Sequence, residues 1–298
     1  MSVKEQARSS WVPGVLTDSV MGGVLTGRSD RLSRRLVWVV LVVLFAGGWG
    51  QGLLTAVQFL AGHDPRDPHP SVSRVWSQGV EGFSQAALLV VAVVLAVRWA
   101  GVPPSAVGLR LPRTRGDWLG EVTGAGWGVL LTVVSFSLVT TAYPSIPAQN
   151  AEILDALTGW LAGPSEEMVF IVAAVVLLRR AQYSWTLVVL VSAVARVSFH
   201  IYYGPTSVFL LVWAAGVVLL YRATGRVLGI IAAHALWDLY AALAVLPWWW
   251  CTVASFILVV GLSLIAAAAI MVPLTCRYMT RDPALDPNVA GSLPRATV

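Results

Sequence analysis

Eight long apolar stretches constrain this chain more than any other feature, because each is close to the length that a helix needs to cross a bilayer. A spanning helix takes about 20 apolar residues, and the stretches fall at residues 36–61, 78–99, 118–142, 153–178, 184–203, 206–221, 227–246 and 251–273. Hydrophobic residues make up 57% of the chain and charged residues 12%, whereas soluble domains carry about 25% charge. Open sheets cannot span lipid, and the alternation of a barrel is missing. The predicted fold class is therefore all-α, a polytopic membrane protein with about eight transmembrane helices.

The basic residues predict the orientation of these helices. All of the 20 basic residues except Arg66, Arg74 and Arg196 lie in segments that an eight-helix topology places on one side of the membrane. Basic residues concentrate on the cytoplasmic side, so both termini are expected to face the cytoplasm. The same bias accounts for the net charge of +5 without a nucleic-acid partner.

The chain is expected to form one membrane domain with polar ends. Residues 1–35 are predicted to be a disordered cytoplasmic segment. The first thirty residues are polar and lack the pattern of a signal peptide, so the first helix is expected to be an uncleaved anchor. The other predicted parts are a first group of about three helices within 36–150 with a basic cytoplasmic link at 98–117, a second helix bundle at 151–247, a last transmembrane helix at 248–273 and a cytoplasmic tail at 274–298.

Three polar clusters interrupt the second bundle at positions that should lie within the membrane. They are Glu166-Glu167, Arg196 with His200, and His234 with Asp238. A charged side chain in hydrocarbon is costly, so its presence there suggests a function. Residues four apart share a helix face, so Asp238 is able to orient the His234 imidazole. Arg196 needs a carboxylate partner, and either glutamate is a candidate.

The clusters favour a reaction centre over purely structural pairing. Polar contacts that only hold membrane helices together usually use Ser, Thr or Asn, which are cheaper to bury than charges. Here two glutamates, two histidines and an aspartate are spread over three helices. A proton-coupled transporter is a further alternative, because carboxylates and histidines also form proton relays. Against it, the chain shows neither a repeated half nor matching interrupted helices.

In order and spacing, these residues resemble the CPBP family of intramembrane proteases, which includes the type II CAAX prenyl endopeptidases and the bacterial Abi or bacteriocin-processing proteins. The resemblance covers residues 154–245, and the matching text is Ser165-Glu166-Glu167-Met168-Val169-Phe170, Ser198-Phe199-His200-Ile201-Tyr202-Tyr203-Gly204 and Ala233-His234-Ala235-Leu236-Trp237-Asp238.

The chain departs from the family pattern at two positions. Ile171 stands where the motif Glu-Glu-x3-Arg has arginine, and Arg196 stands where Phe-x3-His has phenylalanine. We therefore expect Arg196 to supply the charge that Ile171 lacks. The alternative is a non-catalytic scaffold or a bacteriocin-immunity-type protein of the same fold.

The resemblance implies an endopeptidase that hydrolyses a peptide bond in a membrane-embedded cavity. In this scheme Glu166 is the general base on a water that it shares with His200. His234, oriented by Asp238, polarises the scissile carbonyl or stabilises the oxyanion, and Glu167 positions Arg196. The mechanism works without a cofactor. The family is also called metalloprotease, and a divalent metal such as zinc would then be held by Glu166, His200 and His234.

The resemblance also implies the location and the partners. The protein is expected in the cytoplasmic membrane of a bacterium, with the lipid bilayer and a peptide or membrane-protein substrate as its partners. Lys4 is the only lysine among the 20 basic residues, a bias typical of a high-GC bacterium, where a prenylated substrate is not expected. The substrate and the oligomeric state stay open.

Overall fold

The computed structural model describes residues 33–62, 72–113, 115–142, 160–244 and 248–279. Within these ranges the chain forms helices joined by short turns, and no strand occurs in them, so the all-α prediction is confirmed. Most of the predicted cytoplasmic segment 1–35 and of the tail 274–298 lies outside the described residues, as does the stretch 143–159.

The helices follow the apolar stretches of the sequence. In chain order the elements are α3 (Arg34–Leu60), α4 (Val72–Trp99), η1 (Pro104–Val107), α5 (Arg115–Ala142), α7 (Ala162–Glu167), η2 (Met168–Ala173), α8 (Ala174–Arg180), α9 (Trp185–Ser198), η3 (Ile201–Phe209), α10 (Leu210–Thr224), α11 (Leu228–Ala244) and α12 (Trp248–Met279).

Several of these helices are suited to cross a membrane. Four segments are long and apolar enough, namely those within α4, α5, η3 with α10, and α12. A fifth is α3, which bends by 70° between Gly50 and Gly52. The helices α9 and α11 are apolar but shorter. The fold is thus that of a multi-pass membrane protein, while the total of eight spans stays a prediction.

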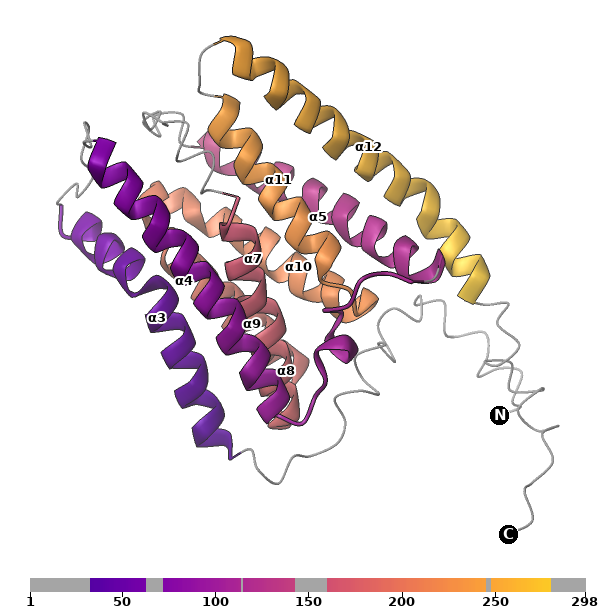
Figure 1. Cartoon of the computed structure of the whole chain (residues 1–298), viewed down its shortest axis with the longest axis horizontal. Coiled ribbons are helices and arrows are strands. Elements are labelled where there is room, and N and C mark those ends of the chain that lie inside the picture. Colours follow the sequence, from indigo (N-terminus) through magenta and orange to yellow (C-terminus); the bar gives the residue numbers. More distant parts are fainter. Residues whose placement is uncertain (1–32, 63–71, 114, 143–159, 245–247, 280–298) are drawn as a thin grey trace.

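One continuous helix, made of α7, η2 and α8, runs through the middle of the bundle (Figure 1). No side chain from Met168 to Leu178 is more than 4% exposed, so this central helix is the core. The helix begins at Ala162, after a turn at residues 160–161, so Gly163-Pro164 falls at its start. Pro164 therefore lies in the first turn, where its missing N–H leaves no hydrogen bond unmade.

The predicted fifth span ends earlier than expected. The sequence indicated a helix over 184–203, but α9 stops at Ser198, and a turn at 199–200 leads into the 3₁₀ segment η3. Gly204 has φ 75° and ψ −164°, a conformation that glycine adopts readily. Pro205 follows it and cannot donate a backbone hydrogen bond. His200 consequently lies in a turn and not on the helix face of Arg196.

Helix α11 is fixed against α5 by close backbone packing. A Cβ atom on Gly229 of α11 would lie only 2.0 Å from the carbonyl oxygen of Glu121 on α5. The Gly229 N–H also donates to Oε2 of Glu121 over 2.6 Å, which satisfies a free N–H at the start of α11. The position of α11 along α5 is therefore well defined.

Helix α3 begins at the end of the bundle where α4 and α8 end (Figure 1), and the sequence has arginines at this end. Arg34 Nε donates to the carbonyl of Ala181 over 3.3 Å, and Arg180 Nε donates to that of Ala100 over 3.2 Å. We call this the basic end, and it carries Arg34, Arg98, Arg110, Arg179, Arg180, Arg222 and Arg226. That it faces the cytoplasm stays a prediction.

Candidate active site

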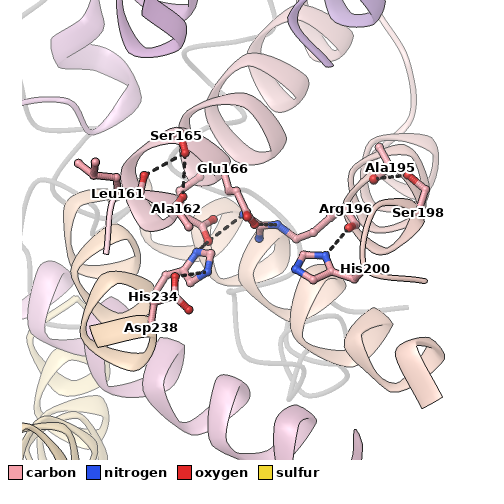
Figure 2. Close-up of polar contacts among 11 residues, drawn as sticks. Leu161, Ala162, Ser165, Glu166, Ala195, Arg196, Ser198, His200, His234 and Asp238 are labelled. Carbon is pink, nitrogen blue, oxygen red and sulfur yellow. Dashed lines mark hydrogen bonds and ion pairs between the residues drawn. The ribbon is translucent and has the colours of Figure 1, made fainter. Parts of the chain in front are cut away.

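The three polar clusters of the sequence come together inside the bundle (Figure 2). The central helix contributes Glu166 and Glu167, α9 contributes Arg196, and α11 contributes His234 and Asp238. The first four of these residues are at most 6% exposed, and the Asp238 side chain is 21% exposed. Charged side chains and an imidazole from three separate elements thus share one buried site. We call these five residues and His200 the polar cluster.

Arg196 pairs with both glutamates, as the sequence predicted for one of them. Its Nη2 atom lies 2.8 Å from Oε1 of Glu167, and its Nε atom lies 3.5 Å from Oε2 of Glu166. The guanidinium also lies over the rings of Trp213 and Phe170, at 4.3 and 5.3 Å from their centroids. Two carboxylates and two aromatic faces therefore replace the water that this buried cation has lost.

His234 lies between two carboxylates. Its Nδ1 atom is 2.8 Å from Oε1 of Glu167, and its Nε2 atom is 3.2 Å from Oδ2 of Asp238. The contact with Asp238 follows from the spacing in the sequence, whereas the contact with Glu167 was not foreseen. Because a carboxylate only accepts, Nδ1 donates to Glu167, and the imidazole forms an ion pair with Asp238 when it carries two protons. The edge of the Trp213 ring packs on the same imidazole, with centroids 4.8 Å apart.

His200 is oriented by the backbone of the helix that precedes it. Its Nδ1 atom donates to the carbonyl oxygen of Arg196 over 2.8 Å. A carbonyl oxygen only accepts, so in the neutral ring the proton lies on Nδ1 and Nε2 is the acceptor. The Phe199 ring packs against the imidazole, with centroids 4.3 Å apart. That Glu166 shares a water with His200 stays a prediction.

A cavity of about 240 Å³ lies next to Glu166. We call it the Glu166 cavity, and its wall comes from α3, α4 and the central helix, with Gly48, Trp49, Gly82, Gln85, Ala86, Leu89, Leu161, Ala162, Ser165 and Glu166. Gln85 donates through Nε2 to the carbonyls of Gly47 and Gly48, which ties α4 to α3 at the cavity. A space of this size holds several water molecules. Glu166 thus borders a hydratable space, while Glu167 is 0% exposed.

The π-helical segment η2 begins directly after the two glutamates. A π turn places an extra residue in the helix, and such insertions are frequent at functional sites. Ile171 lies inside η2 and is 0% exposed. The position where the family pattern has arginine is therefore filled by an apolar core residue, and the cation comes from Arg196 on α9.

The residues present do not fit a metal centre. In the part of the chain that the structure describes, no three His, Cys, Asp or Glu side chains are arranged to hold a metal ion. The set Glu166, His200 and His234, which the sequence suggested as ligands, is thus not assembled. The physical reason is that the Arg196 cation already pairs with both glutamates and that both ring nitrogens of His234 face carboxylates.

Sequence reasoning missed the uncharged residues that frame the polar cluster. Phe170 and Trp213 hold the guanidinium, and Gly82 and Gln85 form the wall of the Glu166 cavity. These side chains lie within apolar stretches or helix interiors, where an aromatic or a glycine is ordinary. The one usable signal was Gln85, a polar residue inside a predicted span.

Comparison with known proteins supports the family resemblance. Residues 148–240, which include the whole polar cluster, match the family model described as type II CAAX prenyl endopeptidase Rce1-like. This segment is therefore similar to the type II CAAX prenyl endopeptidases, and the match is consistent with a membrane protease. No curated protein and no solved structure matches the chain.

Proposed function

We propose that this protein is an intramembrane endopeptidase in which Glu166 activates the water that hydrolyses a peptide bond. The observation that carries the proposal is the unequal environment of two adjacent glutamates. Glu166 borders a hydratable cavity, whereas Glu167 is fully buried in contact with Arg196 and His234. A general base must reach the water that it activates, and this requirement favours Glu166.

The proposed reaction begins when Glu166 takes a proton from a water whose oxygen attacks the scissile carbonyl carbon. The carbonyl oxygen becomes negative and accepts a hydrogen bond from Nε2 of His234. Before the substrate binds, Nε2 carries this proton and faces Oδ2 of Asp238. Glu166 then passes its proton to the leaving amine as the carbon–nitrogen bond breaks. The water supplies the hydroxyl of the new carboxyl group and the proton of the new amine.

The other members of the polar cluster act as positioning residues in this scheme. Glu167 holds Nδ1 of His234, which directs Nε2 toward the substrate. Arg196 balances the charge of both glutamates. His200 presents Nε2 as an acceptor for the same water.

The pairing of Arg196 also bears on the scaffold alternative. That alternative rests on Ile171, which leaves the glutamates without the motif's arginine. Arg196 supplies a cation to both glutamates from the neighbouring helix. The loss of arginine at position 171 is thus no argument for an inactive protein.

The experiment is cleavage of a quenched peptide library by the purified protein in detergent, with and without a chelator. We expect cleavage by the wild type that persists with the chelator and is lost in Glu166→Gln. The matched control is Glu121→Gln, a second buried glutamate that lies outside the polar cluster. Absence of cleavage by the wild type, or full activity of Glu166→Gln, would contradict the proposal.

A further inference from the structure

The Glu166 cavity lies far from the basic end of the bundle. Three helices that reach this end give the same depth, since Gly48 on α3, Gln85 on α4 and Glu166 on the central helix each lie roughly 20 Å along their helix from it. The hydrocarbon layer is about 30 Å thick. Only about a third of the membrane therefore separates the cavity from the opposite face.

The course of α9 gives the same depth independently. Its first residue, Trp185, lies at the basic end, where the guanidinium groups of Arg179 and Arg222 pack over the indole at 5.0 and 4.8 Å. The helix then runs for roughly 21 Å and ends at Ser198. His200 in the following turn is therefore at the level of Glu166.

The basic end itself is closed by contacts between neighbouring elements. Tyr221 donates to the carbonyl of Val107 over 2.9 Å, and a Cβ on Gly108 would lie 2.5 Å from the carbonyl oxygen of Gly225. Asp117 pairs with both Arg110 and Arg226. A substrate arriving at this end would have to pass roughly 20 Å of packed helices to reach Glu166.

We propose that the substrate is an extended, membrane-anchored peptide segment that enters the Glu166 cavity from the face opposite the basic end. Since basic residues mark the cytoplasmic side, this is the extracytoplasmic face. That the peptide is a substrate rests on the proposed function, whereas the side from which the cavity is reached does not depend on catalysis. A carboxyl terminus presented from the cytoplasm is not a substrate of this site.

The small residues of the cavity fit an extended peptide. Gly48, Gly82 and Ala86 lie in its wall, and a Cβ on Gly82 would meet no atom within 4 Å. Glycine lets another backbone come close. The peptide must be extended here, because in a helix its backbone N–H and C=O groups are hydrogen-bonded to each other and the scissile carbonyl is not available to the site. Gly82 therefore faces space that the substrate backbone occupies.

The side of access is tested by labelling single cysteines with a charged maleimide that does not cross membranes. The starting protein has Cys251→Ser and Cys276→Ser, and Gly82→Cys reports on the cavity. Ser105→Cys, at an exposed position of η1 beside the basic end, is the control. We expect intact cells to label Gly82→Cys but not Ser105→Cys, and inside-out vesicles to label Ser105→Cys only.

Two results would overturn the inference. One is labelling of Gly82→Cys only in inside-out vesicles. The other is labelling of Gly82→Cys only after detergent is added. Neither result depends on cleavage, so a failure here is distinct from a failure of the proposed function.

The occupant of the cavity is tested by filling it. Gly82→Leu should lower the cleavage rate by about tenfold or more, because a small displacement of the substrate already costs this much. The matched control is Gly47→Leu, since a Cβ there also meets no atom within 4 Å but lies outside the cavity wall. Equal rates for the two variants would contradict the proposal that substrate fills the cavity.

Discussion

At the scale of residues, the balance of charge in the polar cluster decides which side chains tolerate change. Glu166, Glu167 and Asp238 share the site with one permanent cation, Arg196. A second positive charge is present when both nitrogens of His234 are protonated. Removing Arg196 takes the cation from buried Glu166, and removing His234 takes the cation from Asp238, whereas Glu167 keeps one partner in either case. Loss of a buried partner is far more costly than weakening a surface ion pair.

Arg196→Ala is therefore expected to destabilise the protein by about 3–5 kcal/mol, the usual effect of breaking a buried pair. Thermal unfolding in detergent measures this effect. Arg196→Lys is the matched control, since it keeps the charge but loses the planar contact with Trp213 and Phe170. Adding Ile171→Arg to Arg196→Ala should restore part of the stability. An unfolding temperature of Arg196→Ala equal to that of the wild type would contradict the assigned pairing.

Asp238→Asn is expected to keep most of the cleavage activity. An amide oxygen is still an acceptor beside Nε2 of His234. Asp238→Leu has a similar size but no acceptor, and its cleavage rate should fall by about 10²-fold or more. Comparison of the two initial rates decides the matter, and equal loss in both variants would show that the negative charge itself is required.

The polar cluster illustrates what sequence can predict about single residues. The cost of burying Arg196 predicted a glutamate partner, and the spacing of His234 and Asp238 predicted their contact. Neither argument could show that Glu167 contacts both Arg196 and His234, because this depends on how α9 and α11 face the central helix. The sequence therefore predicted which residues meet, and the packing decided how the two glutamates differ.

At the scale of elements, the position of α11 along α5 controls the geometry of His234. Gly229→Ala would place a Cβ 2.0 Å from the Glu121 carbonyl oxygen, so α11 has to move away from α5. We expect lower thermal stability and slower cleavage, since a displacement of about 1 Å in a catalytic group costs up to 10²-fold in rate.

Gly124→Ala is the control on the same interface. A Cβ on Gly124 would lie 3.6 Å from Ile230, an ordinary contact, and alanine favours a helix by about 1 kcal/mol over glycine. This variant should match or exceed the wild type in stability. If both variants behaved alike, the close packing at Gly229 would not be what fixes α11.

Helix boundaries show where the apolar pattern stops being informative. Runs of apolar residues predicted the helices of the described part, because each helix must bury its backbone polar groups within itself. The same runs continue through Ser198 and through η2, so composition alone shows neither the end of α9 nor the π turn. Gly204-Pro205 was the available sign of a break, but the break begins several residues before it.

At the scale of the whole molecule, the short helix α9 is consistent with a site that water reaches. With 14 residues, α9 is roughly 21 Å long and therefore shorter than the hydrocarbon layer. The sequence could predict a multi-pass helical protein from its composition. It could not predict that His200 lies level with Glu166, because the apolar pattern continues through His200 whereas α9 ends at Ser198.

The central claim is that Glu166 performs the chemistry and Glu167 holds the site together. The measurement that tests it most directly is the cleavage rate of Glu166→Gln beside its unfolding temperature, with Glu167→Gln as the neighbouring control. We predict that Glu166→Gln unfolds at the wild-type temperature and loses about 10²-fold or more in rate, while Glu167→Gln loses stability. Wild-type cleavage by Glu166→Gln would contradict the account.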